Sequence, residues 1–438
     1  MSKPSHTSQP LAVQPVYLAA SAVNTLVRVL PAGTAYCIGI VLITMFTGQL
    51  VYHQGSLARA ALPYVVHLRW GWHRVERAME RGKVSLDALF DRAFTWGLAS
   101  LPVEPVRVGS AGRTVHAIDS STVARLRANK KRCALLGKGY CHRAQRAVQA
   151  NLVAALTTVV LIGGVRVGLV RRTRLGATCQ EAVEKVFAAL PESAEPRLFS
   201  VDAGIATIAQ FQAATDRDAL VGRLRKNATV RRAPHPKPPA QRGRPALHGP
   251  VVHPGAQGPE GHPDEDTTIR IEERAVRVRR WGNLHFRQTP GTSIDVVRVD
   301  DPAYQRPLLI GTTARELTTE EIRIAYGHRW PVETNFYVAQ GTCAMERPRA
   351  WSATAVERRI SLALLAGSLL KAIAAACPPL PMGPWDVKAV ASAGRLANHL
   401  ALQAGHFVAL ALQDLAPRTY RKITNTKETI EVQLPLAA

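Results

Sequence analysis

Four polar side chains near residue 330 are spaced so that they can act together. They are Tyr326, Arg329, Glu333 and Gln340. On a helix this spacing places a phenol, a guanidinium, a carboxylate and an amide along one side, a set unsuited to a hydrophobic core. Pro331 disfavours helix at the residue before it and fits the start of a new helix, so we expect a break near Trp330 with Glu333 in the next first turn. An ordinary amphipathic helix with solvated charges is the competing interpretation.

Two aspartates each follow a short apolar run that reads as a β-strand. Asp119 ends the run of residues 114–118, and Asp202 ends the run of residues 198–201. Side chains at the ends of neighbouring strands can meet above a sheet, where binding and catalytic groups often lie. Each aspartate also has a structural interpretation, because either could serve the turn that follows it.

The charge balance of the chain indicates what these carboxylates would act on. The 438 residues include 56 Lys and Arg against 32 Asp and Glu, a formal net charge of +24. Such an excess favours a polyanionic partner, with nucleic acid first and an anionic membrane surface second. Two Mg²⁺ ions about 3.5–4 Å apart, held by two or three carboxylates, would activate an oxygen nucleophile and neutralise the leaving oxygen of a phosphodiester.

The elements that must position these groups follow from the hydrophobic pattern. Apolar residues at spacings of three and four predict helices between residues 16 and 100. From residue 113 the pattern predicts strands and helices in alternation, including a hairpin that turns at Gly163 and Gly164. Residues 231–266 are rich in Pro, Gly, His and Arg and predict a loop.

The last part of the pattern returns from strands to helices. Alternating residues between 268 and 311 predict exposed strands, and Thr318 with Glu320 and Glu321 predicts a capped helix. Long apolar helices at residues 356–376 and 396–415, and a final strand at 429–434, complete the expected elements. This order predicts an α/β fold, with a small mixed sheet and helices packed on it.

The residues around the three acids resemble a known catalytic signature. The runs Ile-Asp-Ser-Ser at 118–121, Val-Asp-Ala-Gly at 201–204 and Tyr-x-x-Arg-Trp-x-x-Glu at 326–333 are similar to those of bacterial insertion-sequence transposases. The resemblance is to the Asp-Asp-Glu (DDE) class, which has a ribonuclease-H-like core, a β-strand insertion before the glutamate and a Tyr-Arg-Glu-Lys signature. Segments at 221–228, 241–245 and 281–285 agree with it, and it spans about residues 111–375.

The resemblance implies roles for individual residues. Asp119, Asp202 and Glu333 would be the catalytic triad and hold two Mg²⁺ ions, for which Mn²⁺ would substitute. Tyr326 and Arg329 would contact phosphates at the transposon end. Trp281 lies in the insertion, where related enzymes stack an aromatic ring on a flipped base, and a plain core position is its alternative. Gln340 stands at the lysine position of the signature and brings no charge.

The resemblance also implies an organisation and an activity. The expected parts are a disordered tail at 1–15, a helical DNA-binding domain at 16–108, a ribonuclease-H-like catalytic domain at 109–228 and 305–400, a β-strand insertion at 229–304, and a C-terminal helix and tail at 401–438. A homodimer on the terminal inverted repeats would cut the transposon ends with water and then join the freed 3′-OH to target DNA. Such a protein would be cytoplasmic and associated with the nucleoid.

Several other readings of the sequence remain as alternatives. A catalytically inactive, transposase-derived DNA-binding protein would keep the charge without the reaction. A membrane-associated protein could be built on residues 35–51, which lie between Arg28 and Arg59 in a stretch without charge, although a buried helix is favoured there. Six cysteines without a Cys-x-x-Cys pair predict reduced thiols, and four histidines scattered through the loop are poor zinc ligands; these are His235, His248, His253 and His262.

Overall fold

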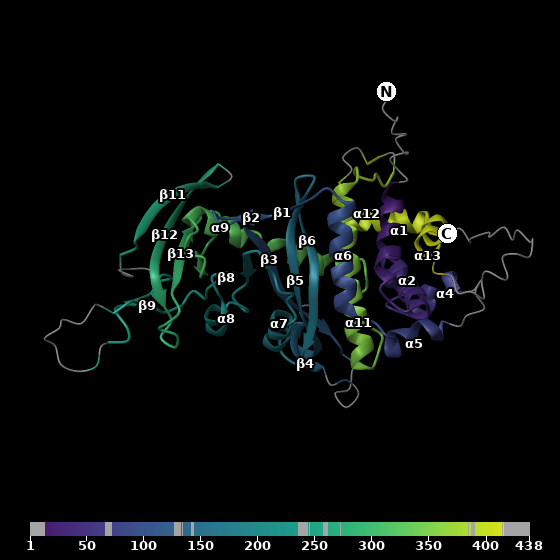
Figure 1. Ribbon diagram of the computed structural model, residues 1–438, viewed down its shortest axis with the longest axis horizontal. Helices are drawn as coiled ribbons and strands as arrows, with labels where there is room; N and C mark the ends of the chain where they lie inside the picture. The colour runs from purple at the N-terminus through teal and green to yellow at the C-terminus, as the bar shows by residue number, and fades with distance from the viewer. Residues whose placement is uncertain are drawn as a thin grey trace, which may run out of the picture. The chain divides into compact units, whose positions relative to one another are not determined.

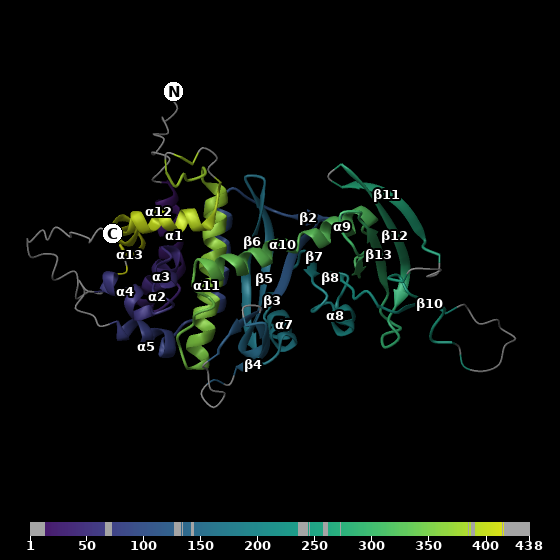
Figure 2. The same ribbon diagram turned by 180° about the vertical axis from the view of Figure 1, so that it is seen from behind.

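The chain divides into two compact units. A computed structural model describes residues 14–415, apart from 66–71, 127–132, 134, 142–143, 235–243, 245, 257–261, 272, 384, 387–389 and 414. One unit, called here the helical unit, comprises Met1–Trp96 with Ala339–Ala438, and the other, the sheet unit, is Gly97–Val338. These limits do not coincide with the domain limits expected at residues 108 and 305, and the functional division of the chain stays a prediction. Figures 1 and 2 label the elements from the front and from behind.

The helical unit gathers helices from both ends of the chain. Asn24 donates a hydrogen bond to the Ala411 carbonyl at 3.2 Å, and the rings of Phe46 and Phe407 lie 6.2 Å apart. The expected helices between residues 16 and 100 are therefore packed against helices from the C-terminal part, while the expected helical positions at 66–71 lie outside the described residues. The helices that supply this unit, wholly or in part, are α1 (Gln14–Val27), α2 (Ala32–Phe46), α3 (Gln49–Tyr52), α4 (Leu57–Val65), α5 (His73–Arg81), α6 (Leu86–Ser100), α11 (Ala353–Ala376), α12 (Ala393–Leu402) and α13 (Ala404–Leu412).

Two apolar helices of this unit are buried in its interior. Helix α2 covers most of residues 35–51, and 12 of its 15 residues are buried, as expected for a buried helix. Within the described part of the chain, α11 alone is long and apolar enough to cross a membrane, and 83 % of its most apolar window is buried inside the protein. A core helix passes the same test of length and composition, so α11 gives only weak support to a membrane role.

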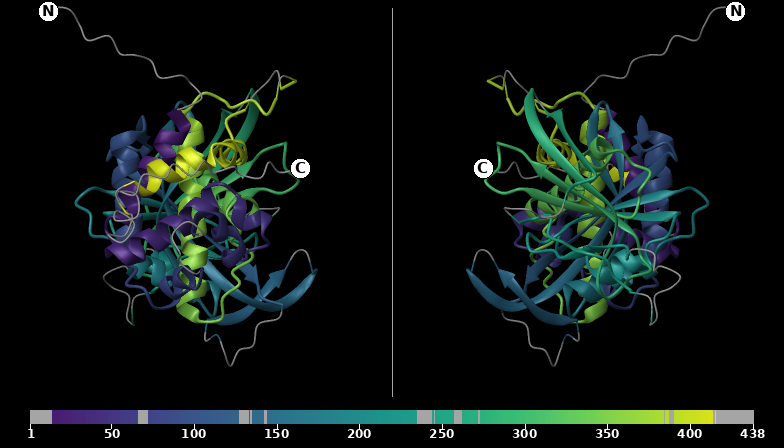
Figure 3. Two further views of the ribbon diagram at one scale, coloured as in Figure 1. Left: turned by 90° about the vertical axis from the view of Figure 1, so that its right-hand side faces the viewer. Right: turned by 90° about the vertical axis from the view of Figure 1, so that its left-hand side faces the viewer.

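The sheet unit has a mixed α/β architecture, with a large mixed sheet and flanking helices. Figure 3 shows its strands fanned by the twist of the sheet. The strands are β1 (Val103–Pro105), β2 (Arg107–Val108), β3 (Arg113–Ala124), β4 (Leu136–Cys141), β5 (Arg146–Ile162), β6 (Val165–Gly176), β7 (Arg197–Val201), β8 (Asp218–Arg223), β9 (Val230–Arg232), β10 (Val251–Val252), β11 (Glu265–Ile271), β12 (Arg274–His285), β13 (Ile294–Asp300) and β14 (Leu308–Thr312). The helices are α7 (Cys179–Ala188), α8 (Ile208–Ala213), α9 (Thr319–Gly327) and α10 (Trp330–Gly341), the last of which continues into residues of the helical unit.

Strand β3, which carries Asp119, lies between β5 and β7 in the sheet. It pairs antiparallel with β5 and parallel with β7, and β7 pairs parallel with β8. Strands β5 and β6 form the predicted hairpin, which turns at Gly163 and Gly164, both with positive φ. Beyond β8 the sheet continues through β14, β13, β12 and β11 with antiparallel pairing.

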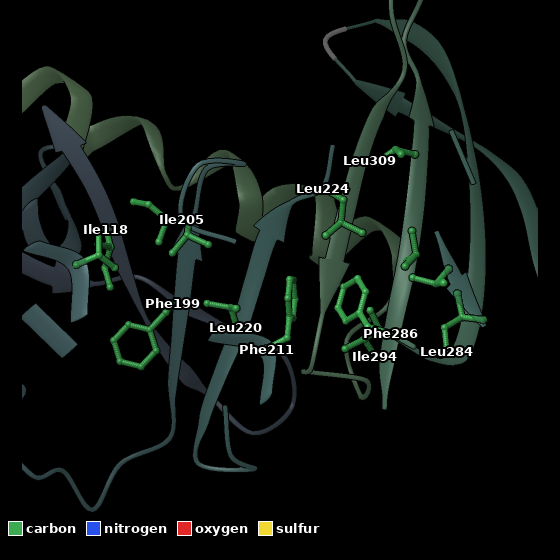
Figure 4. Close-up of a cluster of buried hydrophobic side chains, with 14 of the residues drawn as sticks. Ile118, Phe199, Ile205, Phe211, Leu220, Leu224, Leu284, Phe286, Ile294 and Leu309 are labelled. Atoms are coloured by element: carbon green, nitrogen blue, oxygen red, sulfur yellow. The ribbon is translucent and has the colours of Figure 1, made fainter. Parts of the chain in front are cut away.

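Alternate residues of the central strands feed two hydrophobic cores. On β7, Leu198 belongs to one core and Phe199 and Val201 belong to the other. The first core includes Ile322 of α9, and the second includes Val183 of α7 and the side chains labelled in Figure 4. Because side chains alternate across a strand, this pattern places α9 and α7 on opposite faces of the sheet.

Three segments differ from the sequence expectation or lie outside it. Residues 396–415 form two helices in place of one, because Gln403 leaves helical geometry (φ −102°, ψ 23°) between α12 and α13. The predicted loop at 231–266 contains a short antiparallel pairing of β9 with β10 and includes the start of β11. The strand predicted at 429–434 lies outside the described residues.

The predicted cap of α9 is confirmed and gives a first testable expectation. Thr318 accepts a hydrogen bond from the Glu321 backbone N–H, and the Glu321 side chain accepts one from the Thr318 backbone N–H, a complete capping box. Thr318→Ala is expected to lower the free energy of unfolding by about 1 kcal/mol, measured by urea denaturation. Thr318→Ser keeps the hydroxyl and should unfold close to wild type. An alanine variant as stable as wild type would contradict a stabilising role for this cap.

Candidate active site

Asp119 and Asp202 lie at equivalent positions on two neighbouring strands. Ile118 on β3 pairs with Val201 on β7 in parallel register, and each is followed directly by its aspartate. Strand β3 continues to Ala124, whereas β7 ends at Val201, so Asp202 opens the loop that leads to α8. The parallel register therefore brings together two carboxylates that are distant in the sequence.

The third acid is placed by the junction of α9 and α10. Helix α9 ends at Gly327, and α10 begins at Trp330 with Pro331 as its second residue and Glu333 in its first turn. The helix break that Pro331 predicts is therefore confirmed. The Thr334 hydroxyl donates to the Pro331 carbonyl at 2.8 Å within this turn.

Hydrogen bonds and ion pairs connect this junction to both aspartates. Arg329 donates from Nη1 to Asp119 Oδ2 at 3.5 Å and also to Glu333 Oε1. The Tyr326 hydroxyl donates to Asp202 Oδ1 at 3.3 Å. These five side chains, Asp119, Asp202, Tyr326, Arg329 and Glu333, are called here the carboxylate cluster. The predicted catalytic residues and the two predicted phosphate contacts thus belong to one cluster.

The pKa of the Asp119 carboxyl is shifted mainly by burial. This pKa is raised from 3.8 to about 6, chiefly because the group is buried, and the charges of Glu333 and Asp202 contribute to that rise. A 2.7 Å hydrogen bond from the Ser120 backbone N–H and the charge of Arg329 lower that pKa. A nearby negative charge raises the pKa of a carboxyl because it disfavours the ionised form.

The two partner residues are perturbed as well. Burial raises the pKa of the Tyr326 hydroxyl, so it stays protonated and can donate to Asp202. Burial disfavours the charge of Arg329, but Tyr326, Glu333 and Asp119 outweigh it and the pKa of the guanidinium is raised. Only 12 % of the Arg329 side chain is exposed, compared with 19 % for Asp119 and 32 % for Glu333. The cluster is therefore a shielded, charged site.

The donor chemistry of the carboxylate cluster fits Mg²⁺, which prefers carboxylate oxygens and keeps several waters. Its side-chain positions do not yet form a cage, because no group of three or more His, Cys, Asp or Glu side chains among the described residues is close enough to hold a metal ion. The Arg329 guanidinium supplies the positive charge between Asp119 and Glu333. Binding of a metal ion by these acids would therefore require their side chains and that of Arg329 to rearrange.

Two predicted site residues are not among the five side chains of the carboxylate cluster. Trp281 on β12 is fully buried in the core that also contains Leu284 and Ile294. This is the core position that the sequence left open as the alternative to base stacking, and the buried ring presents no face to a base. Gln340 is half-buried on α10, seven residues and about two helical turns after Glu333.

Sequence reasoning missed two arginine-rich cavities beside the cluster. A cavity of about 300 Å³ is lined by Tyr326 and Arg329 and by Arg223, Tyr304, Arg306, Pro307, Leu308, Arg323, Gly327 and Trp330. The Trp330 and Tyr304 side chains are 61 % and 65 % exposed. A second cavity has a volume of about 700 Å³. It is lined by Ala203, which follows Asp202, and by Arg225, Arg231 and Arg287 among others. No acidic residue is among the described residues that line either cavity.

The sequence held a partial signal for these cavities. Arg223 and Arg225 lie in the segment 221–228, which was part of the resemblance. Tyr304, Arg306 and Arg287 come from connections between strands, where no periodic pattern marks their direction.

Comparisons with known proteins do not assign the chain to a family. No protein-family model matches the sequence, and no curated protein matches it. The interpretation of the carboxylate cluster therefore depends on its residue types, its geometry and the signature in the sequence.

Proposed function

We propose that this protein is a DNA transposase of the Asp-Asp-Glu class, which cuts transposon ends and joins them to target DNA. The observation that carries the proposal is the convergence of Asp119, Asp202 and Glu333 from three distant segments onto one shielded cluster. The spacing of Tyr326, Arg329 and Glu333 matches the family signature, and all three side chains belong to that cluster.

The strand order supports a ribonuclease-H-like core. Strands β6, β5 and β3 form an antiparallel meander, and β7 and β8 continue beside β3 in parallel. Between β8 and the helices α9 and α10, the strands from β9 to β14 extend the sheet, at the place where the family carries its β-strand insertion. This arrangement agrees with an insertion that precedes the glutamate.

The proposed reaction assigns each residue of the cluster a task. Asp119, Asp202 and Glu333 would hold two Mg²⁺ ions, which supply an activated oxygen nucleophile and neutralise charge on the leaving oxygen. Water would attack the phosphodiester at the transposon end and release a 3′-OH, and that hydroxyl would then attack a phosphodiester of the target. Tyr326 orients Asp202 through its hydroxyl, and Arg329, once it has left the acids, can grip a phosphate.

The charge of the surroundings supports a nucleic-acid substrate. Both cavities beside the cluster carry several arginines, and the chain as a whole has a net charge of +24. Phosphate contacts by Arg and Lys supply most non-specific DNA affinity, and that affinity falls steeply as salt rises. Recognition of the terminal repeats by the helices at residues 16–108, synapsis by a homodimer and a place at the nucleoid belong to the same proposal.

A catalytically inactive DNA-binding protein derived from such an element is the second candidate. Two observations favour it: Gln340 replaces the signature lysine, and Arg329 already neutralises two of the acids. The two candidates share their charge and fold, so only the reaction separates them.

A cleavage assay on the DNA that flanks the gene tests the proposal. We expect the purified protein to nick a duplex carrying the terminal repeats at the transposon end, leaving a 3′-OH, with Mg²⁺ or Mn²⁺ but not with EDTA. Salt-sensitive binding of the same duplex without any cleavage would favour the inactive DNA-binding protein. Absence of both binding and cleavage would contradict both candidates.

A further inference from the structure

A buried amide on α10 joins this helix to strand β6. Asn335 donates from Nδ2 to the Gly168 carbonyl at 2.8 Å, and its side chain is fully buried. Asn335 follows Glu333 by two residues, so the two side chains point about 200° apart around the helix axis. A rotation or shift of α10 at Asn335 would therefore also move Glu333.

The approach of Asn335 to the sheet depends on a glycine. A Cβ atom at Gly168 would lie 2.9 Å from Asn335 Nδ2 and 3.1 Å from Thr157 Oγ1. A side chain at position 168 would therefore displace the Asn335 amide from its place against the sheet. Glycine is thus needed here for close packing, and φ at this position is not in the left-handed region.

The same contact leads to the strand that carries Asp119. Thr157 lies on β5, and its hydroxyl donates to the Ala117 carbonyl on β3 at 3.4 Å. Ala117 precedes Asp119 by two residues on the same strand. A continuous series of contacts therefore runs from Asn335 through Gly168 and Thr157 to the strand that carries Asp119.

The amide has a cost that points to a positional role. Asn335 Oδ1 has no hydrogen-bond partner among the described residues, although the side chain is fully buried. A buried, unsatisfied acceptor costs stability, and an apolar side chain of similar shape would avoid that cost. The hydrogen bond from Asn335 Nδ2 to the Gly168 carbonyl therefore serves to hold the position of the helix and not to maximise the stability of the core.

We propose that Asn335 is a positioning residue that, with Gly168, fixes the helix carrying Glu333 relative to the strand carrying Asp119, so that both carboxylates can reach one divalent ion once Arg329 has left them. This inference rests on the proposed function. Residues that orient metal ligands typically change metal affinity or activity by about 10- to 100-fold when they are replaced.

The test measures metal affinity separately from catalysis. In Asn335→Leu, which keeps the size of the side chain but removes the donor, we expect the affinity for Mn²⁺, measured by titration calorimetry, to fall about 10-fold. The Mg²⁺ concentration needed for half-maximal cleavage should rise by about the same factor, and saturating Mg²⁺ should restore most of the rate. The dissociation constant for the transposon-end duplex should not change.

A second variant, a double-mutant cycle and a core control distinguish a positioning role from a folding defect. Gly168→Ala should weaken Mn²⁺ binding alone, but should add little in the Asn335→Ala background, where the amide is absent. Val276→Ala removes apolar atoms from the core that contains Ile322 of α9. It should lower the stability of the protein without lowering its Mn²⁺ affinity. Wild-type Mn²⁺ affinity in a folded Asn335→Leu, or an equal loss in Val276→Ala, would overturn the positioning role. A wild-type protein that neither binds Mn²⁺ nor cleaves would overturn the proposed function as well.

Discussion

Purified Asp202→Ala is expected to cut transposon ends at least about 1,000-fold more slowly than wild type, which corresponds to about 4 kcal/mol of transition-state stabilisation. Asp202 follows β7 beside Asp119 and accepts a hydrogen bond from Tyr326. Under the proposed function, its removal would leave one fewer carboxylate to hold the two Mg²⁺ ions. Because phosphate contacts come mainly from basic residues, the affinity for the end duplex should change less than about 3-fold.

A matched control separates this loss from a general effect of charge. Asp216 is an exposed aspartate between α8 and β8, away from the strand end. Asp216→Ala removes the same charge and should cleave at the wild-type rate in the same Mg²⁺ assay. Wild-type cleavage by Asp202→Ala would refute the catalytic assignment, whatever the behaviour of the control.

Asp119→Asn is expected to change how stability depends on pH. Burial raises the pKa of Asp119 from 3.8 to about 6 in the folded protein, so the folded state binds the proton more tightly than the unfolded state. The stabilisation from this proton is fully present below pH 3.8 and is lost as the pH rises through about 6. The shift corresponds to about 3 kcal/mol, since one pKa unit is about 1.4 kcal/mol.

The measurement compares the two proteins at two pH values in EDTA. Between pH 4 and pH 7, wild type should lose about 2 kcal/mol of unfolding free energy relative to Asp119→Asn, measured by urea denaturation. Mg²⁺ favours the ionised carboxyl and should restore stability to wild type at pH 7 but much less to the variant. Parallel pH dependence of the two proteins would show that the pKa of Asp119 is not raised in the folded protein.

The sequence predicted the site better than it predicted the surroundings of the site. Asp119 and Asp202 were singled out because each follows a short apolar run, although only β7 ends at its acid and β3 continues past Asp119 to Ala124. Pro331 marked the helix break before Glu333. The pattern could not reveal that Arg329 bridges two acids, because a pairing across more than 200 residues depends on tertiary packing. It also could not decide between the two positions considered for Trp281, since an aromatic residue in an alternating strand fits either face.

The arginine that bridges Asp119 and Glu333 also bears on when the protein would be competent to cut. The Arg329 guanidinium already balances these acids, so under the proposed function a metal ion would have to displace it in order to bind. A DNA phosphate is the natural competitor for a guanidinium, since the two form strong bidentate pairs. Under the proposed function, the arrival of substrate would itself unlock the metal site. A protein molecule that has not bound a DNA phosphate at Arg329 would then be unable to cleave DNA.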